Sequence, residues 1–410
     1  MKVLFYNHTA KVSGAEKVLL MLLTHLDQSR FTPLVLCPTG TLKQLIEEAE
    51  IPCIEVEELN VRFTWRPDYL IRYVRSFLSV MRGIRSAVRQ ANPDVIHANG
   101  TRAGLVMIAA TSGMSVPVIC HLHELLPAHP LSVIIRAFIL CSARLQILAV
   151  SHAAARSFQG LLWRLAPHRV SVKVIHNAVT GFHPDEICRQ KTRQELELTD
   201  QTLALGIVGN ITANKGQLEL ILAFAKVVKT VPQAQLLIIG APIFNQRDQD
   251  YDELLRRTAQ SLELTRHIKF IGYRTDIPEL LQAIDILIVN SESEACPLVV
   301  LEGILSGTTI IATAVGGIPE ILQHNVTGLL IPPRDEQALI DAIRKLSEFS
   351  YRRTELAANA QQKGTIQFSV THYSEKLGDY YQDLVRTKNI NNLPALYCDI
   401  PSSQASNKGD

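Results

Sequence analysis

Residues 286–305 read ILIVNSESEACPLVVLEGIL, which is a short apolar run, a polar turn and a longer apolar run. The apolar residues 286–289 indicate a buried strand. Residues 297–305 predict a helix, because Pro297 suits a first helical turn and Ser306-Gly307 suits a helix end. The stretch is therefore a strand, a turn and a helix, the repeating unit of parallel sheets.

The same alternation extends along the chain on both sides of this unit. Further strands of the same series are predicted at 202–208, 235–239, 268–271, 309–312 and 328–331, and helices at 216–229, 250–263, 277–284, 317–323 and 335–347. An earlier series has predicted strands at 2–7, 31–36, 94–97, 116–120, 146–150 and 172–175, separated by helical segments. Two series of this kind predict an α/β protein with two doubly wound domains, each a mostly parallel sheet covered by helices.

The domain boundaries follow from the polar stretches. The Pro-containing segment 183–193 is the predicted interdomain link, so we expect an N-terminal domain at 1–183 and a C-terminal domain at 184–370. Residues 371–386 are expected to form a helix that crosses back to the N-terminal domain, and 387–410 a disordered tail. Ligands of such sheets bind at the carboxyl ends of the strands, so the site is expected in a cleft between the two domains.

Composition excludes several classes of protein. The 410 residues are 47% hydrophobic, and the seven cysteines form no C-x-x-C pair, so neither a disulfide framework nor a structural zinc site is expected. The longest apolar region, 131–150, contains Arg136 and Arg144 and is too short and too charged for a transmembrane helix. The N-terminus lacks a signal-peptide core, and we expect a cytoplasmic protein.

Two strand-to-helix turns could hold a phosphate group. Ser13-Gly14-Ala15 opens the helix after the first strand, where free N–H groups and the helix dipole favour an anion. Lys215 precedes Gly216 and a helix in the second series, so its ammonium group could reach the cleft. Each feature has an ordinary alternative, a simple capping turn at Gly14 and a solvated loop lysine at 215.

Two carboxylates, Glu294 and Glu302, are eight residues apart in the opening unit. At about 100° per residue, the predicted helix is apolar on nearly every side, and Glu302 is its only charge. Burial of an isolated carboxylate is costly, so Glu302 either has an internal donor or binds the hydroxyl groups of a ligand. Glu294 lies before the helix, at the expected cleft, unless it is an ordinary surface residue.

These features together resemble the retaining GT-B glycosyltransferases of family 4, also called group 1. The resemblance covers nearly the whole chain and rests on the order of several short motifs. They are Ser13-Gly-Ala-Glu16, His121-Leu-His-Glu-Leu-Leu-Pro127, Val150-Ser-His-Ala-Ala-Ala155, Val174-Ile-His-Asn-Ala-Val179, Lys215-Gly216, Glu294-x7-Glu302, Gly316-Gly-Ile-Pro-Glu320 and Gly328-Leu-Leu-Ile-Pro332. The resemblance implies two Rossmann-like domains and transfer of a sugar from a nucleotide sugar, UDP- or GDP-linked.

The resemblance assigns residues to the nucleotide part of this co-substrate. Glu302 would bind the ribose hydroxyl groups, and Lys215 the diphosphate. Gly14 and the backbone amides near Leu298 and Val299 would also contact the phosphates. The family pattern requires no metal ion and no further cofactor.

The resemblance also assigns residues to the sugar and the base. Glu294 would bind sugar hydroxyl groups, and His123 would lie near the reacting carbon. The alternatives are that His123 is a core histidine, or that His121, one strand period earlier, has this role. Tyr273 and Arg274, which follow a predicted strand, are weaker candidates for the nucleobase.

One residue departs from the family pattern. Asn210 stands where the family commonly has an arginine that neutralises the diphosphate. An amide donates hydrogen bonds but carries no charge, so either Lys215, the helix dipoles and another arginine suffice or donor affinity and transfer are reduced. Asp248-Gln-Asp250 has the appearance of a metal-binding triplet, but its polar surroundings predict a solvated loop.

The acceptor is expected to bind the N-terminal half, which carries a positive charge. Residues 1–180 have 19 Lys and Arg against 11 Asp and Glu, a formal charge of +8. In the predicted helix 69–90, one arc carries arginines and another carries apolar residues, namely Arg72, Arg75, Arg82, Arg85 and Arg89 against Phe77, Met81, Ile84 and Val88. Such a helix suits peripheral binding to an anionic membrane and a lipid-linked acceptor. The alternative is a surface helix whose apolar arc packs inward.

Two other functions compete with transfer of a sugar to a glycan or lipid-linked acceptor in polysaccharide or glycolipid synthesis. A sugar-nucleotide epimerase of the same fold would act without an acceptor. A non-catalytic nucleotide-sugar-binding protein would account for Asn210 as a mark of lost catalysis. Nucleic acid is a poor partner, because no basic stripe is interleaved with aromatic residues.

Overall fold

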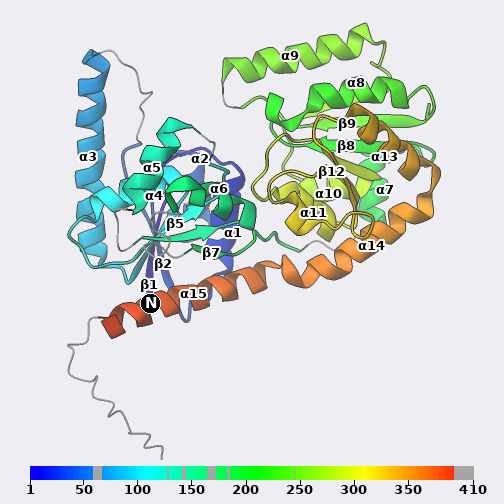
Figure 1. Cartoon of the computed structure of the whole chain (residues 1–410). Helices are drawn as coiled ribbons and strands as arrows, with labels where there is room; N and C mark the ends of the chain where they lie inside the picture. The colour runs from blue at the N-terminus through cyan, green and yellow to red at the C-terminus, as the bar shows by residue number, and fades with distance from the viewer. Residues whose placement is uncertain are drawn as a thin grey trace, which may run out of the picture.

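The structure is a computed structural model, and it describes residues 1–58, 67–126, 129–140, 145–163, 172–181, 185–243 and 245–391. Figure 1 shows two lobes side by side, each built around a twisted sheet, with α14 and α15 running along one side of both. Among the described residues, every helix is either too short or too polar to cross a lipid bilayer.

The N-terminal domain contains a seven-stranded parallel sheet with the order β3-β2-β1-β4-β5-β6-β7. Its strands are β1 (Lys2–Tyr6), β2 (Thr32–Cys37), β3 (Cys53–Glu55), β4 (Val95–Asn99), β5 (Val118–Leu122), β6 (Leu145–Ala149) and β7 (Val172–Val174). Its helices are α1 (Gly14–His25), α2 (Thr41–Glu48), α3 (Pro67–Ala91), α4 (Thr101–Ala110), α5 (Pro130–Leu140) and α6 (His152–Trp163).

The C-terminal domain contains a six-stranded parallel sheet with the order β10-β9-β8-β11-β12-β13. Its strands are β8 (Leu203–Val208), β9 (Ala234–Ile239), β10 (Ile268–Gly272), β11 (Ile286–Val289), β12 (Thr309–Thr313) and β13 (Leu329–Ile331). Its helices are α7 (Glu186–Glu195), the 3-10 turn η1 (Ala213–Lys215), α8 (Gln217–Val227), α9 (Gln246–Ser261), α10 (Ile277–Ala283), α11 (Leu298–Leu305), α12 (Ile318–Ile321), α13 (Glu336–Glu348) and α14 (Ser350–Gln367).

Both sheets are apolar on both faces. In β1, Val3 and Phe5 join one apolar cluster, while Leu4 and Tyr6 join another on the opposite face. Continuous apolar strands of this kind need helices on both faces, and the two predicted doubly wound, Rossmann-like domains are confirmed. In each sheet the strand order reverses at the centre, between β1 and β4 and between β8 and β11. These reversal points are where such sheets bind ligands.

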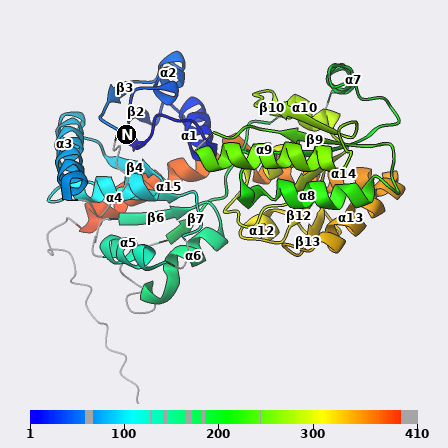
Figure 2. The same cartoon turned by 90° about the horizontal axis from the view of Figure 1, so that it is seen from above.

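The last helix, α15 (Val370–Asn391), joins the core of the N-terminal domain. Its Tyr373, Leu377 and Tyr381 are buried together with Phe5 and Leu19. Figures 1 and 2 show α15 passing from beside the C-terminal domain to the far side of the N-terminal domain. The C-terminal end of the chain therefore contributes core residues to the N-terminal sheet.

A carboxylate of the C-terminal domain also holds the two domains together. Glu320 on α12 accepts hydrogen bonds from the backbone amides of His152 and Ala153 at the start of α6, both at 2.7 Å. It also accepts one from His176 Nε2 at 3.0 Å. Burial alone would raise the pKa of Glu320, but these donors outweigh burial and lower it. The carboxylate therefore stays ionised at the positive end of a helix dipole.

Several sequence-based expectations differ from the structure. Strand β3 was not predicted, because Ile54 and Glu55 face solvent and no apolar alternation marks it. Most of the expected link 183–193 is instead helix α7, whose Arg189 and Arg193 bond to Asp285. The expected boundary at 183 and 184 lies outside the described residues. Residues 387–391 of the expected disordered tail belong instead to α15, and 392–410 lie outside the described residues.

The Asp248-Gln-Asp250 segment was expected to be a loop and lies in α9 instead. The helix begins at Gln246, because the side chain of Asn245 accepts from the amides of Arg247 and Asp248. The described residues contain no group of three or more His, Cys, Asp or Glu side chains placed to hold a metal ion.

Candidate active site

A pocket lies between the carboxyl ends of the two sheets, where the sequence predicted a cleft. One wall comes from the loop after β1, the start of α1 and the end of β5. The opposite wall comes from the loops after β8, β10 and β11 and from α11. Ten of the predicted residues line it, namely Gly14, His123, Asn210, Lys215, Tyr273, Arg274, Glu294, Leu298, Val299 and Glu302.

Two helices direct their N-terminal ends into this pocket from opposite sides. A side chain added at Gly14, the first residue of α1, would stand 3.9 Å from Leu298 Cδ1, at the first residue of α11. Ser13 forms a capping box with Glu16, as the ordinary interpretation of this turn required. Pro297 is the N-cap of α11 rather than its first helical residue. The free amides of two helix ends make this part of the pocket favourable for an anion.

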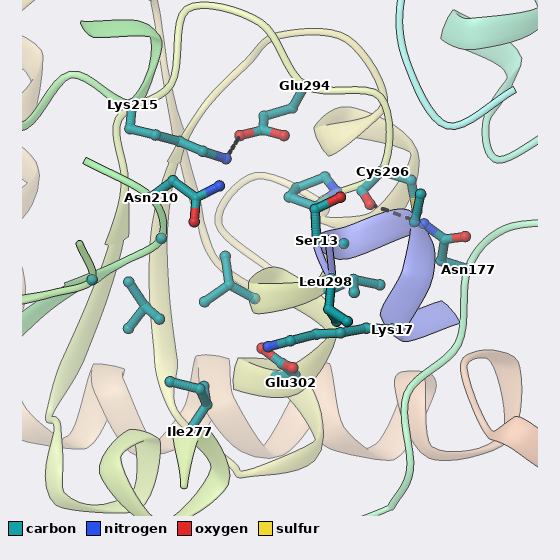
Figure 3. Close-up of a pocket in the computed structure, with 18 of the residues that line it drawn as sticks. Ser13, Lys17, Asn177, Asn210, Lys215, Ile277, Glu294, Cys296, Leu298 and Glu302 are labelled. Atoms are coloured by element: carbon teal, nitrogen blue, oxygen red, sulfur yellow. Dashed lines mark hydrogen bonds and ion pairs between the residues drawn. The ribbon is translucent and has the colours of Figure 1, made fainter. Parts of the chain in front are cut away.

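Lys215 and Glu294 form an ion pair on the C-terminal wall. Lys215 Nζ lies 2.5 Å from Glu294 Oε1, and that oxygen also accepts from Ser291 Oγ at 2.8 Å. Figure 3 shows this pair at one end of the pocket. Gly216, the next residue, lets this loop pass close to the backbone of Asn290. It has φ +67°, and a Cβ there would stand 2.2 Å from the Asn290 carbonyl oxygen. A ligand phosphate would therefore compete with Glu294 for the same ammonium group.

Glu302 lies at another part of the pocket, one turn into α11, and is partly exposed there. No described residue donates a hydrogen bond to its carboxylate, and Figure 3 shows the Lys17 side chain extending toward it. Burial raises the pKa of Glu302, and the positive charge of Lys17 opposes that rise. The sequence left two alternatives for Glu302, an internal donor or the hydroxyl groups of a ligand. The described residues supply no such donor, so the carboxylate is available for a ligand.

His123 lies at the carboxyl end of β5 and lines the pocket. Its Nε2 is 2.8 Å from Asn99 Oδ1, and burial lowers its pKa to about 3. His121, the alternative from the sequence, is fully buried behind it, with Nδ1 3.1 Å from His97 Nε2. The structure therefore brings His123, and not His121, to the pocket.

Comparisons with known proteins agree with this arrangement. A sequence profile described as "Glycosyltransferase Family 4" matches residues 12–180, and one described as "Glycosyl transferases group 1" matches residues 189–363. The chain belongs to this glycosyltransferase family. The two profiles divide the chain near the predicted domain boundary.

Curated relatives of the family are similar over part of the chain. D-inositol 3-phosphate glycosyltransferase of Corynebacterium kroppenstedtii is 27% identical over 54% of this chain and 49% of its own length. N-acetyl-alpha-D-glucosaminyl L-malate synthase of Bacillus anthracis is 28% identical over 47% of this chain and 49% of its own. The chain therefore spans about half the length of these relatives.

Solved structures are similar to nearly the whole chain. HepE of Anabaena, crystallised with UDP-glucose, is 26% identical with a TM-score of 0.79, covering 93% of this chain and 100% of HepE. A glycosyltransferase of Rickettsia africae has the same TM-score at 19% identity, covering 94% and 98% of the two chains, which shows the shared fold alone. The GT-B fold expected from the sequence is confirmed.

Asn210, the departure from the family pattern, lies beside Lys215 in Figure 3. Its backbone carbonyl accepts from Gln217 Nε2 at 3.0 Å, which holds the loop after β8. Lys17, which the sequence interpretation did not select, lines the pocket from the opposite domain. Its position in the first turn of α1, three residues after Gly14, was the available signal.

Tyr273 and Arg274 follow β10 and line the pocket, but only the Arg274 side chain is held by ion pairs. Tyr273 is 61% exposed. The Arg274 guanidinium is already held by Asp276 and by Glu195 Oε1, the latter at 2.7 Å. Tyr273 is therefore the freer of the two for stacking on a base. Ile277 adds an apolar surface beside them that the sequence interpretation did not include.

The basic helix α3 is only partly as predicted. Ile84 and Val88 are buried in the domain core, and Met81 packs against it, so this part of the apolar arc faces inward. Arg85 donates to the backbone carbonyls of Ala110 and Ser112 at 2.9 and 2.8 Å, and so it is a structural residue. Arg75, Arg82 and Arg89 are exposed, whereas the side chain of Arg72 lies outside the described residues.

Proposed function

We propose that this protein is a retaining glycosyltransferase that moves a sugar from a UDP-sugar to a saccharide or lipid-linked acceptor. The observation that carries the proposal is the set of groups around one cleft. Two helix N-termini and Lys215 suit a diphosphate, and Glu302 has a carboxylate without a described donor. HepE, similar over nearly its full length, was crystallised with UDP-glucose, which favours uracil over guanine as the base.

In this proposal both walls of the cleft contact the donor. Glu302 accepts hydrogen bonds from the ribose hydroxyl groups, and Lys215 with the starts of α1 and α11 neutralises the diphosphate. When Lys215 turns to the phosphate, Glu294 loses its ionic partner but keeps the Ser291 hydrogen bond, and it becomes free to accept from sugar hydroxyl groups as well. His123 contacts the sugar from the N-terminal wall.

Transfer then needs positioning and charge stabilisation more than an added base. The bond between the anomeric carbon and the phosphate oxygen breaks, and the acceptor oxygen forms a new bond on the same face of the sugar. The leaving phosphate oxygen takes the proton of the acceptor hydroxyl group. Lys215 and the two helix ends stabilise the negative charge that develops on the diphosphate.

The exposed arginines of α3 are proposed to bring the protein to the inner face of an anionic membrane for a lipid-linked acceptor in polysaccharide or glycolipid synthesis. Sedimentation with phosphatidylserine vesicles at low salt tests this. Changing Arg75 and Arg82 together to glutamate should release the protein, whereas Arg257→Glu on α9 should not. A wild-type protein that stays in the supernatant contradicts membrane binding.

Incubation with radiolabelled UDP- and GDP-sugars, with and without membranes, tests the function as a whole. Membrane-dependent incorporation of label, or slow hydrolysis of the donor without acceptor, supports a transferase. Formation of a free epimer without acceptor would instead show an epimerase. Tight binding with no turnover of any sugar would show a binding protein that has lost catalysis. Asn210, which lines the pocket, would then be the first residue to test as the cause.

A further inference from the structure

The side chain of His123 is held by a neighbouring amide. Asn99 is the last residue of β4, and His123 follows the end of the adjacent strand β5. Asn99 is 2% exposed, and its Oδ1 lies 2.8 Å from His123 Nε2. This contact fixes one nitrogen of the imidazole ring, so the orientation of the Asn99 amide decides where the ring carries its proton.

Two backbone carbonyls determine the orientation of that amide. Asn99 Nδ2 donates to Asn7 Oδ1 at 2.8 Å and to the Ala15 carbonyl at 3.4 Å. Asn7 Nδ2 in turn donates to the Thr9 carbonyl at 2.8 Å. A backbone carbonyl can only accept, so turning either amide around would place two acceptors against each other. The chain of hydrogen bonds therefore has one direction, with Asn99 Oδ1 as the acceptor facing His123.

His123 must then carry its proton on Nε2. Its other nitrogen, Nδ1, is shielded from solvent and has no partner among the described residues. The lowered pKa of about 3 keeps the ring neutral, so Nδ1 holds a lone pair and not a second proton. An unpaired buried acceptor is costly unless a ligand supplies a donor.

We propose that Asn99 is a positioning residue that holds His123 as the Nε2–H tautomer, so that in a hydrogen bond with a hydroxyl group of the donor sugar Nδ1 is the acceptor. The inference rests on the proposed function and adds a direction to its sugar contact. His123 receives a hydrogen bond from the sugar and does not donate one. A sugar whose facing hydroxyl group is replaced by fluorine has no proton to give and should lose this contact.

The tautomer can be measured in the protein without any ligand. With 15N-labelled histidine, the two ring nitrogens give distinct chemical shifts for the Nε2–H and Nδ1–H forms, and the signals of His123 are identified by their loss in His123→Gln. We expect a single Nε2–H tautomer at neutral pH. Adding UDP-glucose should shift the Nδ1 signal, whereas adding UDP alone should not.

Two substitutions at Asn99 separate positioning from simple folding. Asn99→Leu removes the acceptor at similar size, so His123 should become a mixture of tautomers and kcat/KM should fall about tenfold. Asn99→Asp keeps an acceptor facing Nε2 but loses the donor to Asn7 and Ala15, so Nε2 should stay protonated while the added negative charge favours uptake of a second proton on the ring. Tyr381→Phe is the matched control, because it removes the hydroxyl group 2.7 Å from His97 Nδ1 and leaves Asn99 untouched.

A wild-type His123 in the Nδ1–H form, or a His123 spectrum unchanged by Asn99→Leu in a folded protein, would overturn the proposal. So would a Nδ1 signal that fails to respond to UDP-glucose when calorimetry shows that the donor is bound. The proposed function is tested separately. A protein with the expected tautomer that transfers no sugar would contradict the function and leave the tautomer in place.

Discussion

The two walls of the cleft use different chemistry. The C-terminal wall is ionic, because Lys215 and Glu294 form a close pair and Glu302 carries a carboxylate that Lys17 approaches from the other side. The N-terminal wall around His123 is neutral, since burial lowers the pKa values of all three clustered histidines. In the proposed function, the ionic groups Lys215 and Glu302 supply affinity for the charged nucleotide, whereas the neutral His123 orients an uncharged sugar through a directed hydrogen bond.

Removal of the Glu302 carboxylate should have the largest effect on this contrast. Glu302→Ala should weaken UDP binding about 100-fold, because two ribose hydroxyl groups lose a charged acceptor. His123→Gln on the neutral wall should leave UDP affinity nearly unchanged. Isothermal titration calorimetry measures both, with Glu292→Ala as a control at an exposed carboxylate paired with Arg334. Unchanged affinity in Glu302→Ala would remove the assignment.

Loss of the Lys215 charge should have the second largest effect on UDP affinity. Lys215→Met should weaken UDP binding about 30-fold, since the diphosphate loses a charge-assisted contact and meets an unpaired Glu294. Adding Glu294→Gln should recover part of the loss by removing that repulsion. Lys226→Met, which breaks an exposed pair with Glu336, is the matched control. A double variant that binds no better than Lys215→Met alone contradicts the competition between phosphate and Glu294.

A positive charge added at Asn210 should strengthen UDP binding by the C-terminal wall. Asn210→Arg should tighten UDP binding about tenfold, because a guanidinium group would neutralise the diphosphate beside Lys215. The same calorimetric titration measures it, with Asn210→Gln as the uncharged control of greater length. Weaker binding in the arginine variant would mean that the pocket is built for an amide at this position.

The pH dependence of binding should be smaller and should come from the same wall. Burial raises the pKa of Glu302 above the ordinary 4.5, against the opposing charge of Lys17. The ionised carboxylate accepts from the ribose, so acidification should weaken UDP binding at a pH above 4.5, severalfold more than in Glu302→Gln. Comparing the two proteins cancels the titration of UDP itself. Parallel pH profiles would show that Glu302 does not titrate in this range.

Much of the site could be predicted from local sequence. Gly14, Lys215 and Glu294 each follow a strand that reads as apolar, and the carboxyl ends of parallel strands meet at one edge of a sheet. Their convergence therefore needed only the strand assignments. Other features depended on distant packing. Arg85 is an ordinary member of a basic arc in the sequence, yet α4 ends beside it and its carbonyls bind the guanidinium.

Local sequence was sufficient to predict the two doubly wound domains, the cleft between them and ten of the residues that line it. Hydrophobic periodicity and turn residues reflect local conformation, so they can be recognised without knowledge of the tertiary contacts. Long-range packing was needed to reveal the pairing of Lys215 with Glu294, the approach of Lys17 to Glu302 and the direction of the Asn7, Asn99 and His123 hydrogen bonds. These features could not be predicted because the partner of a side chain, and hence its protonation and charge, depends on atoms that folding brings in from elsewhere in the chain.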